Sequence, residues 1–490
     1  MKRIVVPFVS LLLAMMLATV ASAQGLQPGT GNVNFTVMNM SETATAHVRA
    51  DYVNQSGVVE KYVEKDIDPL SSDGFPITDS GLPDNWLGSV IVSADQEIVA
   101  FAQARWELGT YGDGKTAGAY NGFTAGSDKL YFPSLSARAG KQVSSISVQS
   151  AEGPSESETI PISIKYYDRD GTLNKEVTDT LLKGTQKTYD LMDAGLTANR
   201  PDGWLGAAVV TATGGDPIAG AATMHWQEYT GAYSAVTGGG TTANLPSATR
   251  RIDSGGDWLQ YTAVIVQNLD ESTDASVTVD WYDRLGTKLF TFNDTVPANS
   301  SHGYNTRQTG SDVPDHTALH NALGTNWNGS VVVTSNNSVD IVAVANLQWT
   351  DESPVGLAAT SYSSEVSGYA ETFIPATFRR LSGATWKQFT GLIVQNVGTA
   401  ACNNFDVEWR DRAGNMLLSY EDSLSPNISH GYNTKNPADM PSSGWSNIDD
   451  LGSDFRGSVY INAPGCELIA IHNTLWPFWT DSTTYNAFGK

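Results

Sequence analysis

Trp86-Leu87-Gly88-Ser89-Val90 is a short stretch that recurs three more times along the chain. The other copies are Trp204-Leu205-Gly206-Ala207-Ala208, Trp327-Asn328-Gly329-Ser330-Val331 and, with Phe in place of Trp, Phe455-Arg456-Gly457-Ser458-Val459. A further Trp follows each copy about 20 residues later. These residues are Trp106, Trp226, Trp349 and Trp476. Because they lie about 120 residues apart, the repeat has the size of a domain and is too long for a solenoid unit.

Upstream of this stretch, each copy has an alternating run that ends in an aromatic residue, with a Gly five residues later. The aromatic and Gly pairs are Tyr52 and Gly57, Tyr166 and Gly171, Trp281 and Gly286, and Trp409 and Gly414. In copy three the run reads Val277-x-Val279-x-Trp281, a period-two pattern with one buried face. The pattern predicts a strand, and the Asp-Arg-x-Gly that follows predicts a hairpin turn.

Copy four yields about seven short strands in roughly 120 residues, the number that is typical of an immunoglobulin-like sandwich. The predicted strands are Thr372–Arg380, Phe389–Asn396, Asn404–Asp411, Met416–Leu424, His430–Thr434, Gly457–Ala463 and Leu468–Trp476. No segment shows the 3.6-residue period of a long amphipathic helix. We therefore expect an all-β protein of four tandem antiparallel sandwiches, with a barrel or jelly roll as the alternative.

The connections between copies, such as Gly109–Gly126 and Gly231–Thr242, are rich in Gly, Ala, Ser, Thr and Tyr, which indicates surface linkers or extended braces. Domain boundaries placed in them give a signal peptide over 1–23 and sandwich repeats over 24–122, 123–238, 239–366 and 367–490.

The first residues have the pattern of a secretory signal peptide. Lys2 and Arg3 precede an apolar run, and Ala21-Ser22-Ala23 supplies a cleavage site. A membrane anchor is the alternative interpretation, because the run approaches the length of a bilayer span, but the cleavage site argues against it. We expect a secreted, extracellular protein that is associated with the cell surface and has no transmembrane segment in its mature chain.

Charge and motifs limit the possible functions. Lys and Arg total 29 against 52 Asp and Glu, so the net charge is −23 and nucleic acid is an improbable partner. The chain has no HExxH zinc motif and no Gly-x-Ser-x-Gly nucleophile elbow, so we expect no enzyme and no cofactor. Cys402 and Cys466 are its two cysteines. In an exported sandwich they lie in loops at the same end of the domain, which predicts a disulfide.

Candidate ligand contacts are few. His302 and His430 occupy equivalent places in two copies of Ser-His-Gly-Tyr-Asn-Thr, which indicates either a repeated contact loop or a turn into the next strand. Eleven of the 13 Trp residues lie at places shared between copies, as packing residues would. Trp445 and Trp479 do not, and an exposed ring at either place would suit stacking on sugars.

Asp168-Arg169-Asp170-Gly171 has the Asp-x-Asp-Gly pattern of a calcium loop, and an acidic exported protein meets calcium. The equivalent turn in copy three keeps only its first acid, at Asp283, so a hairpin turn explains both segments. Calcium on Asp168 and Asp170 therefore stays a weak expectation.

Copy one differs from the others at its start. Copies two to four open with a Pro-containing strand, whereas copy one begins almost directly at Asn32. Tyr485-Asn486-Ala487-Phe488, near the other end of the chain, echoes Tyr120-Asn121-Gly122-Phe123. An open sheet edge and a spare segment suggest that strand addition joins subunits.

The order of these elements resembles the tandem immunoglobulin-like sandwich repeats of secreted bacterial surface proteins. The resemblance rests on strands that end in Gln-Asn, the aromatic-x-Asp-x-x-Gly turn, Pro-x-x-Ser at Pro297–Ser300 and Pro426–Ser429, Gly-Ser-Val-Val and a final Ile-Val-Ala strand. It implies an extracellular, non-catalytic role. We expect a structural or adhesive surface protein that contacts other surface proteins, glycans or itself, and a secreted carbohydrate-binding protein is the alternative.

Overall fold

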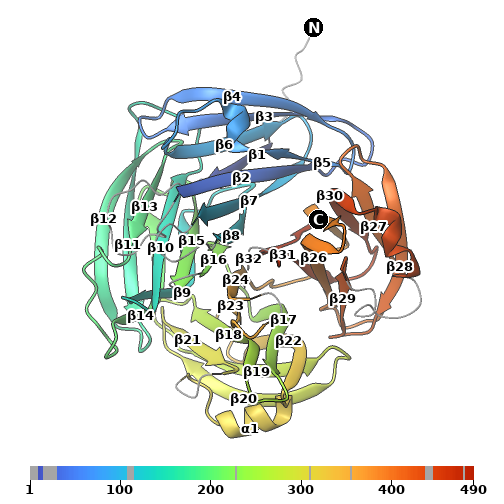
Figure 1. The fold of residues 1–490 in the computed structure, drawn as a ribbon. Coiled ribbons are helices and arrows are strands. Elements are labelled where there is room, and N and C mark those ends of the chain that lie inside the picture. The colour runs from blue at the N-terminus through green and yellow to red at the C-terminus, as the bar shows by residue number, and fades with distance from the viewer. Residues whose placement is uncertain are drawn as a thin grey trace.

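The computed structural model describes residues 9–14, 30–107, 115–226, 229–307, 311–353, 356–435, 445–477 and 481–490. The protein is all-β, with 64% of the described residues in strands and 4% in helices. No helix in these ranges is long and apolar enough to cross a membrane. Successive strands fall into four sets, which we call units one to four (Figure 1).

Unit one contains β1 (Val9–Ala14), β2 (Thr30–Asn39), β3 (Ala46–Asn54), β4 (Val59–Ile67), β5 (Ser72–Phe75), the 3₁₀ helix η1 (Ile77–Ser80), β6 (Gly88–Ala94), β7 (Ile98–Glu107) and β8 (Lys115–Asn121). Unit two contains β9 (Lys129–Arg138), β10 (Gln142–Ser150), β11 (Thr159–Asp168), β12 (Leu173–Leu182), β13 (Gln186–Asp190), β14 (Trp204–Ala212), β15 (Ile218–Trp226) and β16 (Tyr229–Ser234).

Unit three contains β17 (Thr242–Ile252), β18 (Trp258–Asn268), β19 (Ala275–Asp283), β20 (Lys288–Val296), β21 (Ser301–Asn305), α1 (His316–Leu323), β22 (Asn326–Ser335), β23 (Ile341–Trp349) and β24 (Ala358–Ser363). Unit four contains β25 (Glu371–Ser382), β26 (Thr385–Asn396), β27 (Cys402–Asp411), β28 (Met416–Leu424), β29 (Ser429–Asn433), the 3₁₀ helix η3 (Trp445–Leu451), β30 (Asp454–Asn462), β31 (Leu468–Trp476), β32 (Asp481–Asn486) and β33 (Phe488–Gly489).

Every unit has the same antiparallel pairing in two layers. In unit two, β12, β11, β14 and β9 form the layer that we call peripheral, and β13, β10, β15 and β16 form the one that we call axial. The first strand bends to pair with both the sixth and the second strand, so the two layers of units two to four join into one sheet. In unit one they remain two separate four-stranded sheets.

The Trp-x-Gly stretch holds the two central strands of the peripheral layer together. In unit three the ring of Trp327 packs against Trp281, with the ring centroids 5.6 Å apart. A Cβ at Gly329 would lie only 1.8 Å from the backbone oxygen of Tyr282, so only glycine lets β22 approach β19 this closely. The same aromatic contact joins Tyr52 to Trp86, Tyr166 to Trp204 and Trp409 to Phe455.

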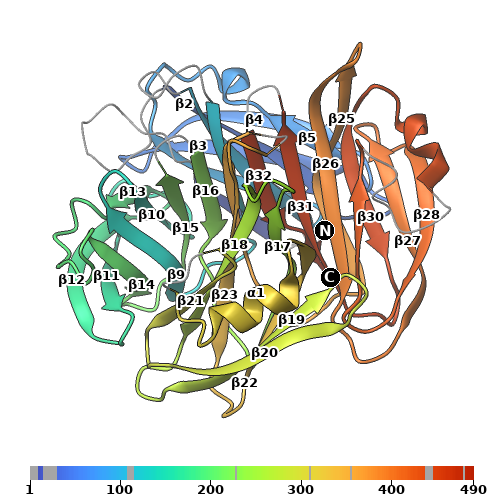
Figure 2. The ribbon, with the colours of Figure 1, turned by 60° about the horizontal axis from the view of Figure 1, so that its bottom comes forward.

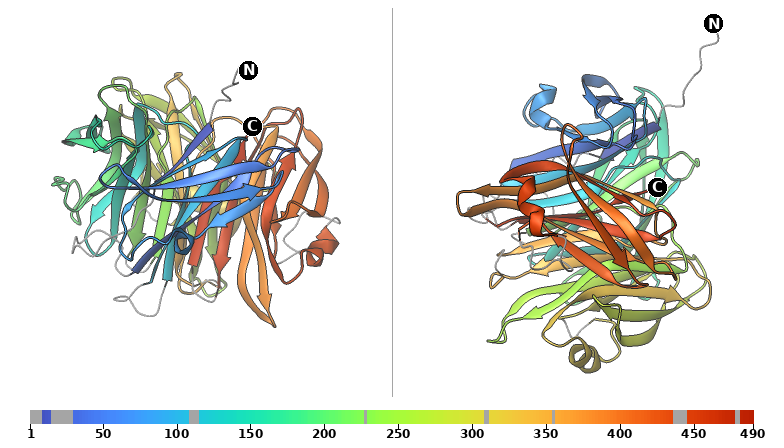
Figure 3. Two further views of the ribbon diagram at one scale, coloured as in Figure 1. Left: turned by 90° about the horizontal axis from the view of Figure 1, so that it is seen from above. Right: turned by 90° about the vertical axis from the view of Figure 1, so that its right-hand side faces the viewer.

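The four units form a closed ring around a central axis. Figure 1 looks along this axis, Figure 2 shows the ring tilted, and Figure 3 shows it from above and from the side. The last strand of each axial layer lies at the centre, where β8 contacts β16, β16 contacts β24, β24 contacts β32, and β32 contacts β8. A small apolar cluster of Met38, Leu70, Val99, Phe373 and Tyr460 joins unit four back to unit one.

The hairpin turn predicted from the aromatic and Gly spacing makes the contact between neighbouring units. Each turn glycine has a positive φ and meets the backbone of the next unit. The glycines and the residues that they approach are Gly57 and Ser155, Gly171 and Ala298, Gly286 and Pro426, and Gly414 and Pro69. Beside them, Arg169 pairs with Asp312, and Arg412 lies 3.4 Å from Asp73 across the seam that closes the ring.

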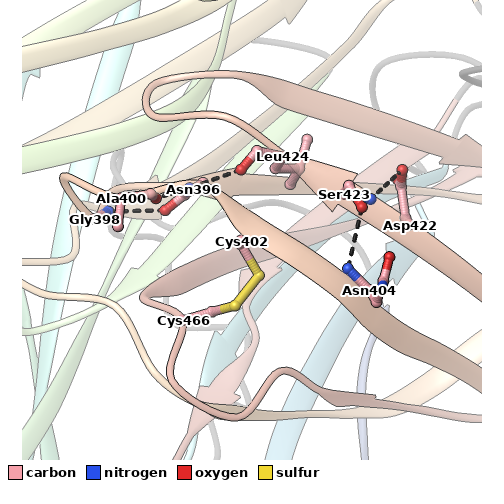
Figure 4. Close-up of a disulfide and its surroundings, with 9 residues drawn as sticks. All are labelled: Asn396, Gly398, Ala400, Cys402, Asn404, Asp422, Ser423, Leu424 and Cys466. Atoms are coloured by element: carbon pink, nitrogen blue, oxygen red, sulfur yellow. Dashed lines mark hydrogen bonds between the residues drawn. A yellow bond between two sulfur atoms is a disulfide. The ribbon is translucent and has the colours of Figure 1, made fainter.

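The predicted disulfide is confirmed. Cys402 and Cys466 are bonded, with their Cα atoms 5.2 Å apart, and the bond ties the start of β27 to the turn before β31 (Figure 4). Nearby, the side chain of Asn396 donates to the backbone oxygens of Ala400 and Leu424, so the same loop is also held by hydrogen bonds.

The all-β class and the antiparallel sheets are confirmed, and the strands expected in copy four match β25 to β31 with shifts at their ends. The immunoglobulin-like kind and the domain boundaries stay predictions. The prediction that the connections between copies are surface linkers is wrong. Gly109–Gly126 contains β8 and Gly231–Thr242 contains the end of β16, and both strands are largely buried at the axis because small residues let them pack there.

Candidate functional site

Four short strands meet on the axis because their side chains are small. A Cβ at Gly118 of β8 would lie 2.8 Å from the Cβ of Ala232 in β16, and one at Gly231 would lie 2.7 Å from the hydroxyl of Ser361 in β24. In unit four, β32 supplies Thr484 to the same surface. Glycine, alanine, serine and threonine therefore allow four backbones to approach each other where larger side chains would hold them apart.

At the carboxyl ends of these strands, the side chains of four equivalent residues form a closed ring of hydrogen bonds. Each side chain donates to the backbone oxygen of the equivalent residue in the preceding unit. The bonds run from Ser234 Oγ to Asn121 at 2.9 Å, from Ser363 Oγ to Ser234 at 3.3 Å, from Asn486 Nδ2 to Ser363 at 2.7 Å and from Asn121 Nδ2 to Asn486 at 2.8 Å. All four units thus contribute one donor and one acceptor to the ring, which we call the polar ring.

A cavity of about 570 Å³ lies at this end of the axis, and we call it the axial pocket. Its wall is formed by the polar ring, by the residues that follow the four axial strands, by Tyr369 and by the chain end from Ala487 to Lys490. Glu97 lies in the same wall, where its carboxylate accepts from Lys490 Nζ at 2.6 Å. The volume is that of a site for a small ligand.

Glu365 is the carboxyl group of the pocket wall whose pKa is clearly shifted. Its Oε1 accepts from Asn486 Nδ2 at 2.7 Å, and its Oε2 accepts from the hydroxyl of Tyr369 at 3.1 Å. Burial raises the pKa of Glu365 to about 7, since desolvation outweighs these two hydrogen bonds. The raised pKa favours the protonated form of this carboxyl group, which can donate as well as accept.

The pocket is equipped for binding. Its described lining contains amides, hydroxyls, carboxyl groups and one lysine, but neither His nor Cys. Across the described ranges, no group of three or more His, Cys, Asp or Glu residues could hold a metal ion. These groups can recognise a polar ligand by hydrogen bonds, with Tyr369 and Phe488 available for contact with its apolar faces.

His302 and His430 are not among the described residues that line the axial pocket. Each has equivalent hydrogen-bond partners within its own unit. His302 Nδ1 lies 2.8 Å from Asp294, which also accepts from the hydroxyl of Tyr304 at 2.9 Å. His430 and Tyr432 share Asp422 in the same way. Each histidine thus belongs to a group of an acid, a base and a tyrosine. The base and the tyrosine stand on the fifth strand of the unit, and their contacts with the acid hold this strand to the fourth.

Unit two keeps this group with different residues, and unit one keeps only its ion pair. In unit two, Lys187 Nζ lies 2.9 Å from Asp179, which also accepts from Tyr189 at 3.0 Å. In unit one the charges are exchanged, because Lys65 stands in the fourth strand and Asp73 in the fifth, 2.9 Å apart. This equivalence follows from the strand register, and it was not visible in the sequence because the residue types differ.

Asp168 and Asp170 both accept hydrogen bonds within unit two. Asp168 Oδ1 accepts from the indole of Trp204 at 2.7 Å, and Asp170 Oδ1 accepts from the backbone N–H of Thr172 at 3.0 Å. Backbone hydrogen bonding by Thr172 lowers the pKa of Asp170. These contacts account for both acids as turn residues, and calcium binding at this turn stays untested.

The two remaining Trp candidates are Trp445 and Trp479. Trp445 begins η3, whose first residues have no described side chains, and Trp479 lies outside the described residues. The sequence did carry a signal for the pocket. Tyr120-Asn121, Tyr233-Ser234, Tyr362-Ser363 and Tyr485-Asn486 stand at equivalent places, but Ser replaces Asn in two of them, so the sequence resemblance is clear only between the first and the last.

Comparison with known proteins adds no assignment, because no family model matches the chain and no curated protein matches it either.

Proposed function

We propose that the protein is an exported, non-catalytic adhesive or structural protein of the cell surface or extracellular matrix, and that it holds its ligand in the axial pocket. The pocket carries this proposal, because its wall offers hydrogen-bonding groups from every unit on a closed framework. A binding site built on rigid strands needs little reorganisation when its ligand arrives. Export follows from the N-terminal pattern, and the disulfide suits an oxidising compartment.

The chemistry of the wall favours a saccharide as the ligand, which is the second candidate function, a secreted carbohydrate-binding protein. Asn, Ser and Glu side chains match the alternating donors and acceptors of sugar hydroxyls, and the rings of Tyr369 and Phe488 suit the C–H faces of a sugar. The Trp residues proposed from sequence are not required for this site.

A filled pocket tests the proposal. Thr237 lines the pocket and is itself exposed, so Thr237→Trp should fill the cavity without disturbing the core. Thr180, exposed on β12 of the peripheral layer, provides the matched control Thr180→Trp. We expect a glycan array to show binding by the chain from Gln24 onward, a loss of at least tenfold in Thr237→Trp and none in Thr180→Trp.

Binding that survives Thr237→Trp, or an array without any signal, would overturn the pocket as a saccharide site. Antibody labelling of intact cells tests the location separately, and electron micrographs of the purified protein test the structural role, since a matrix protein should form ordered filaments or sheets. Retention of the protein inside the cell would contradict export whatever the array shows.

A further inference from the structure

The first strand of unit one comes from the segment that we propose is removed on export. In units two to four the first strand, β9, β17 or β25, pairs with the sixth strand and leads directly into the second by a short turn. In unit one this place beside β6 is taken by β1, which lies within the predicted signal peptide (Figure 1). Cleavage after Ala23 therefore leaves the edge of β6 without a partner strand.

The register between β1 and β6 shows which side chains a strand at the edge of β6 must carry. Leu11 stands opposite Val92 and Leu13 opposite Val90, and the inward-facing Val90 and Val92 are fully buried. In unit two the equivalent positions hold Leu130 and Phe132, which are also fully buried. The same register places hold Ala243 and Leu245 in unit three and Thr372 and Ile374 in unit four. The place beside β6 thus suits an antiparallel strand with apolar side chains at alternate positions.

A buried hydroxyl in unit one lies where the equivalent hydroxyl of each other unit hydrogen-bonds to the first strand. In units two to four the equivalent tyrosine hydroxyl bonds to both the N–H and the C=O of one residue in the first strand. These pairs are Tyr233 with Ser134, Tyr362 with Ser247 and Tyr485 with Ala376. Tyr120 is 2% exposed, and its hydroxyl has no partner in the described part of the chain. The equivalent backbone position is residue 15, which lies outside the described residues.

We propose that, in the exported protein, the edge of β6 accepts an extended strand from a different polypeptide, with a large apolar side chain opposite Val90 and a small or apolar side chain two residues before it. The inference rests on the proposed export, because cleavage vacates the place. Strand addition of this kind satisfies the free N–H and C=O groups of the edge and buries the apolar side chains between the two layers. The donated backbone also reaches the hydroxyl of Tyr120.

Among the described strands, a second copy of the chain has none to donate. Every strand of the described ranges is already paired within its own unit. The segment from Gln24 to Gly29 contains one large apolar residue, Leu26, and its Pro28 lacks the N–H that a paired strand must donate. A foreign strand is therefore the occupant that fits the edge.

The experiment uses the chain from Gln24 onward and a labelled peptide of residues 9–19, flanked by lysines for solubility. We expect fluorescence anisotropy to show binding that weakens at least tenfold when Leu11 and Leu13 of the peptide are both replaced by Ser. Tyr120→Phe should weaken binding of the unaltered peptide a few-fold, while Tyr131→Phe, a half-buried tyrosine of β9, should not. Circular dichroism confirms that each variant is folded.

No binding by a folded chain, or equal binding of the Ser-substituted peptide, would overturn the inference. Self-association that the peptide competes away would assign the edge to a second copy instead and would equally overturn it. Intact mass of the exported protein separates this inference from the proposed function. A chain that retains residues 9–14 fills its own edge and removes the acceptor, whereas saccharide binding at the axial pocket can still be present or absent.

Discussion

At the scale of single residues, the four units conserve an interaction while they change the residues that make it. A carboxylate in one strand meets a nitrogen-bearing side chain in the next, whether this is His302, His430 or Lys187, and in unit one Lys65 and Asp73 exchange places. Such a contact needs a donor and a carboxylate within reach and does not depend on which strand carries the acid. The pairing therefore survives a reversal that a comparison of residue types would miss.

Removal of the acid should show what this pair contributes. Burial raises the pKa of Asp294, but the hydrogen bond and charge of His302 outweigh it, so the pKa lies below its ordinary value. The ionised form therefore stabilises the fold above the unfolded-state pKa, and this stabilisation is lost as pH falls through the folded-state pKa. We expect Asp294→Ala to lower the free energy of unfolding by about 1–3 kcal/mol at pH 7 in urea titrations.

The difference between wild type and Asp294→Ala should shrink as the pH is lowered toward 3. Asp450→Ala changes an exposed acid of η3 and should leave stability within about 0.5 kcal/mol. A constant difference at all pH values would mean that the charge of Asp294 is not what stabilises the fold.

Glu365 predicts a pH dependence of the opposite sign. Its pKa rises to about 7 in the folded protein, above that of an exposed Glu, so the folded state binds its proton more tightly. Stability from this group is fully present below the unfolded-state pKa and is lost as pH rises through 7. We expect the free energy of unfolding of Glu365→Gln to exceed that of wild type by about 1–3 kcal/mol at pH 8. At pH 4.5 the two proteins should have nearly equal stability.

Asp481 serves as the comparison for Glu365, because burial also raises its pKa to about 7 at its place beside Arg105. Its titration remains in Glu365→Gln, so the variant should still lose stability with rising pH, but less steeply than wild type. An unchanged slope would show that Glu365 does not titrate in this range.

At the scale of strands, the Trp-x-Gly stretch works because a large ring and an absent side chain occur two residues apart on one face. The ring covers the core, and the glycine lets the neighbouring backbone pass close by. All four stretches repeat the close approach to a backbone oxygen, at Gly88, Gly206, Gly329 and Gly457. The strand pair at the centre of each peripheral layer therefore depends on this glycine.

Gly329→Ala should destabilise unit three strongly. Its Cβ would lie 1.8 Å from the oxygen of Tyr282 and 2.8 Å from the ring of Trp327, so the two strands must move apart. We expect a loss of more than about 3 kcal/mol in the free energy of unfolding. Gly391→Ala is the matched control, because Gly391 also lies in a strand and its Cβ would meet nothing within 4 Å. Equal stability of the two variants would contradict this account of the stretch.

Sequence patterns identified the strands that alternate polar and apolar residues, and they failed for the strands that do not. In unit four the expected Leu468–Trp476 coincides with β31, because one of its faces is visibly apolar. β8 and β16 are rich in small residues and show no such contrast, so their sequences indicate surface linkers or extended braces. The pocket could not be predicted either, because its wall arises from the meeting of four segments that only the ring brings together.

At the scale of the whole molecule, the chain closes on itself through its last residues. β32 lies against β8, β33 pairs with β25, and Phe101 of unit one stacks on Tyr485 with ring centroids 4.2 Å apart. Each unit therefore has neighbours on both sides. The hairpin turns repeat the same contact at all four seams, so no unit depends only on its own core.

Deletion of Thr484–Lys490 should open the ring. It removes a fully buried tyrosine, one member of the polar ring and the partner of β25. We expect the free energy of unfolding to fall by at least about 4 kcal/mol and small-angle X-ray scattering to show a larger radius of gyration. Lys490→Ala removes only an exposed ion pair with Glu97 and should change stability by less than about 1 kcal/mol. An unchanged radius in the deletion would show that the ring closes without this segment.

The direction of the polar ring has a further consequence. Its four bonds all run in the same rotational sense, from each unit to the one before it, so they form a homodromic circuit. Bond dipoles arranged head to tail around a circle polarise one another while their sum nearly cancels. Each side chain of the polar ring therefore already uses a donor within the protein, and the ring as a whole has little net field. Discrimination between ligands of different charge must come from Glu365, Glu97 and Lys490 on the walls.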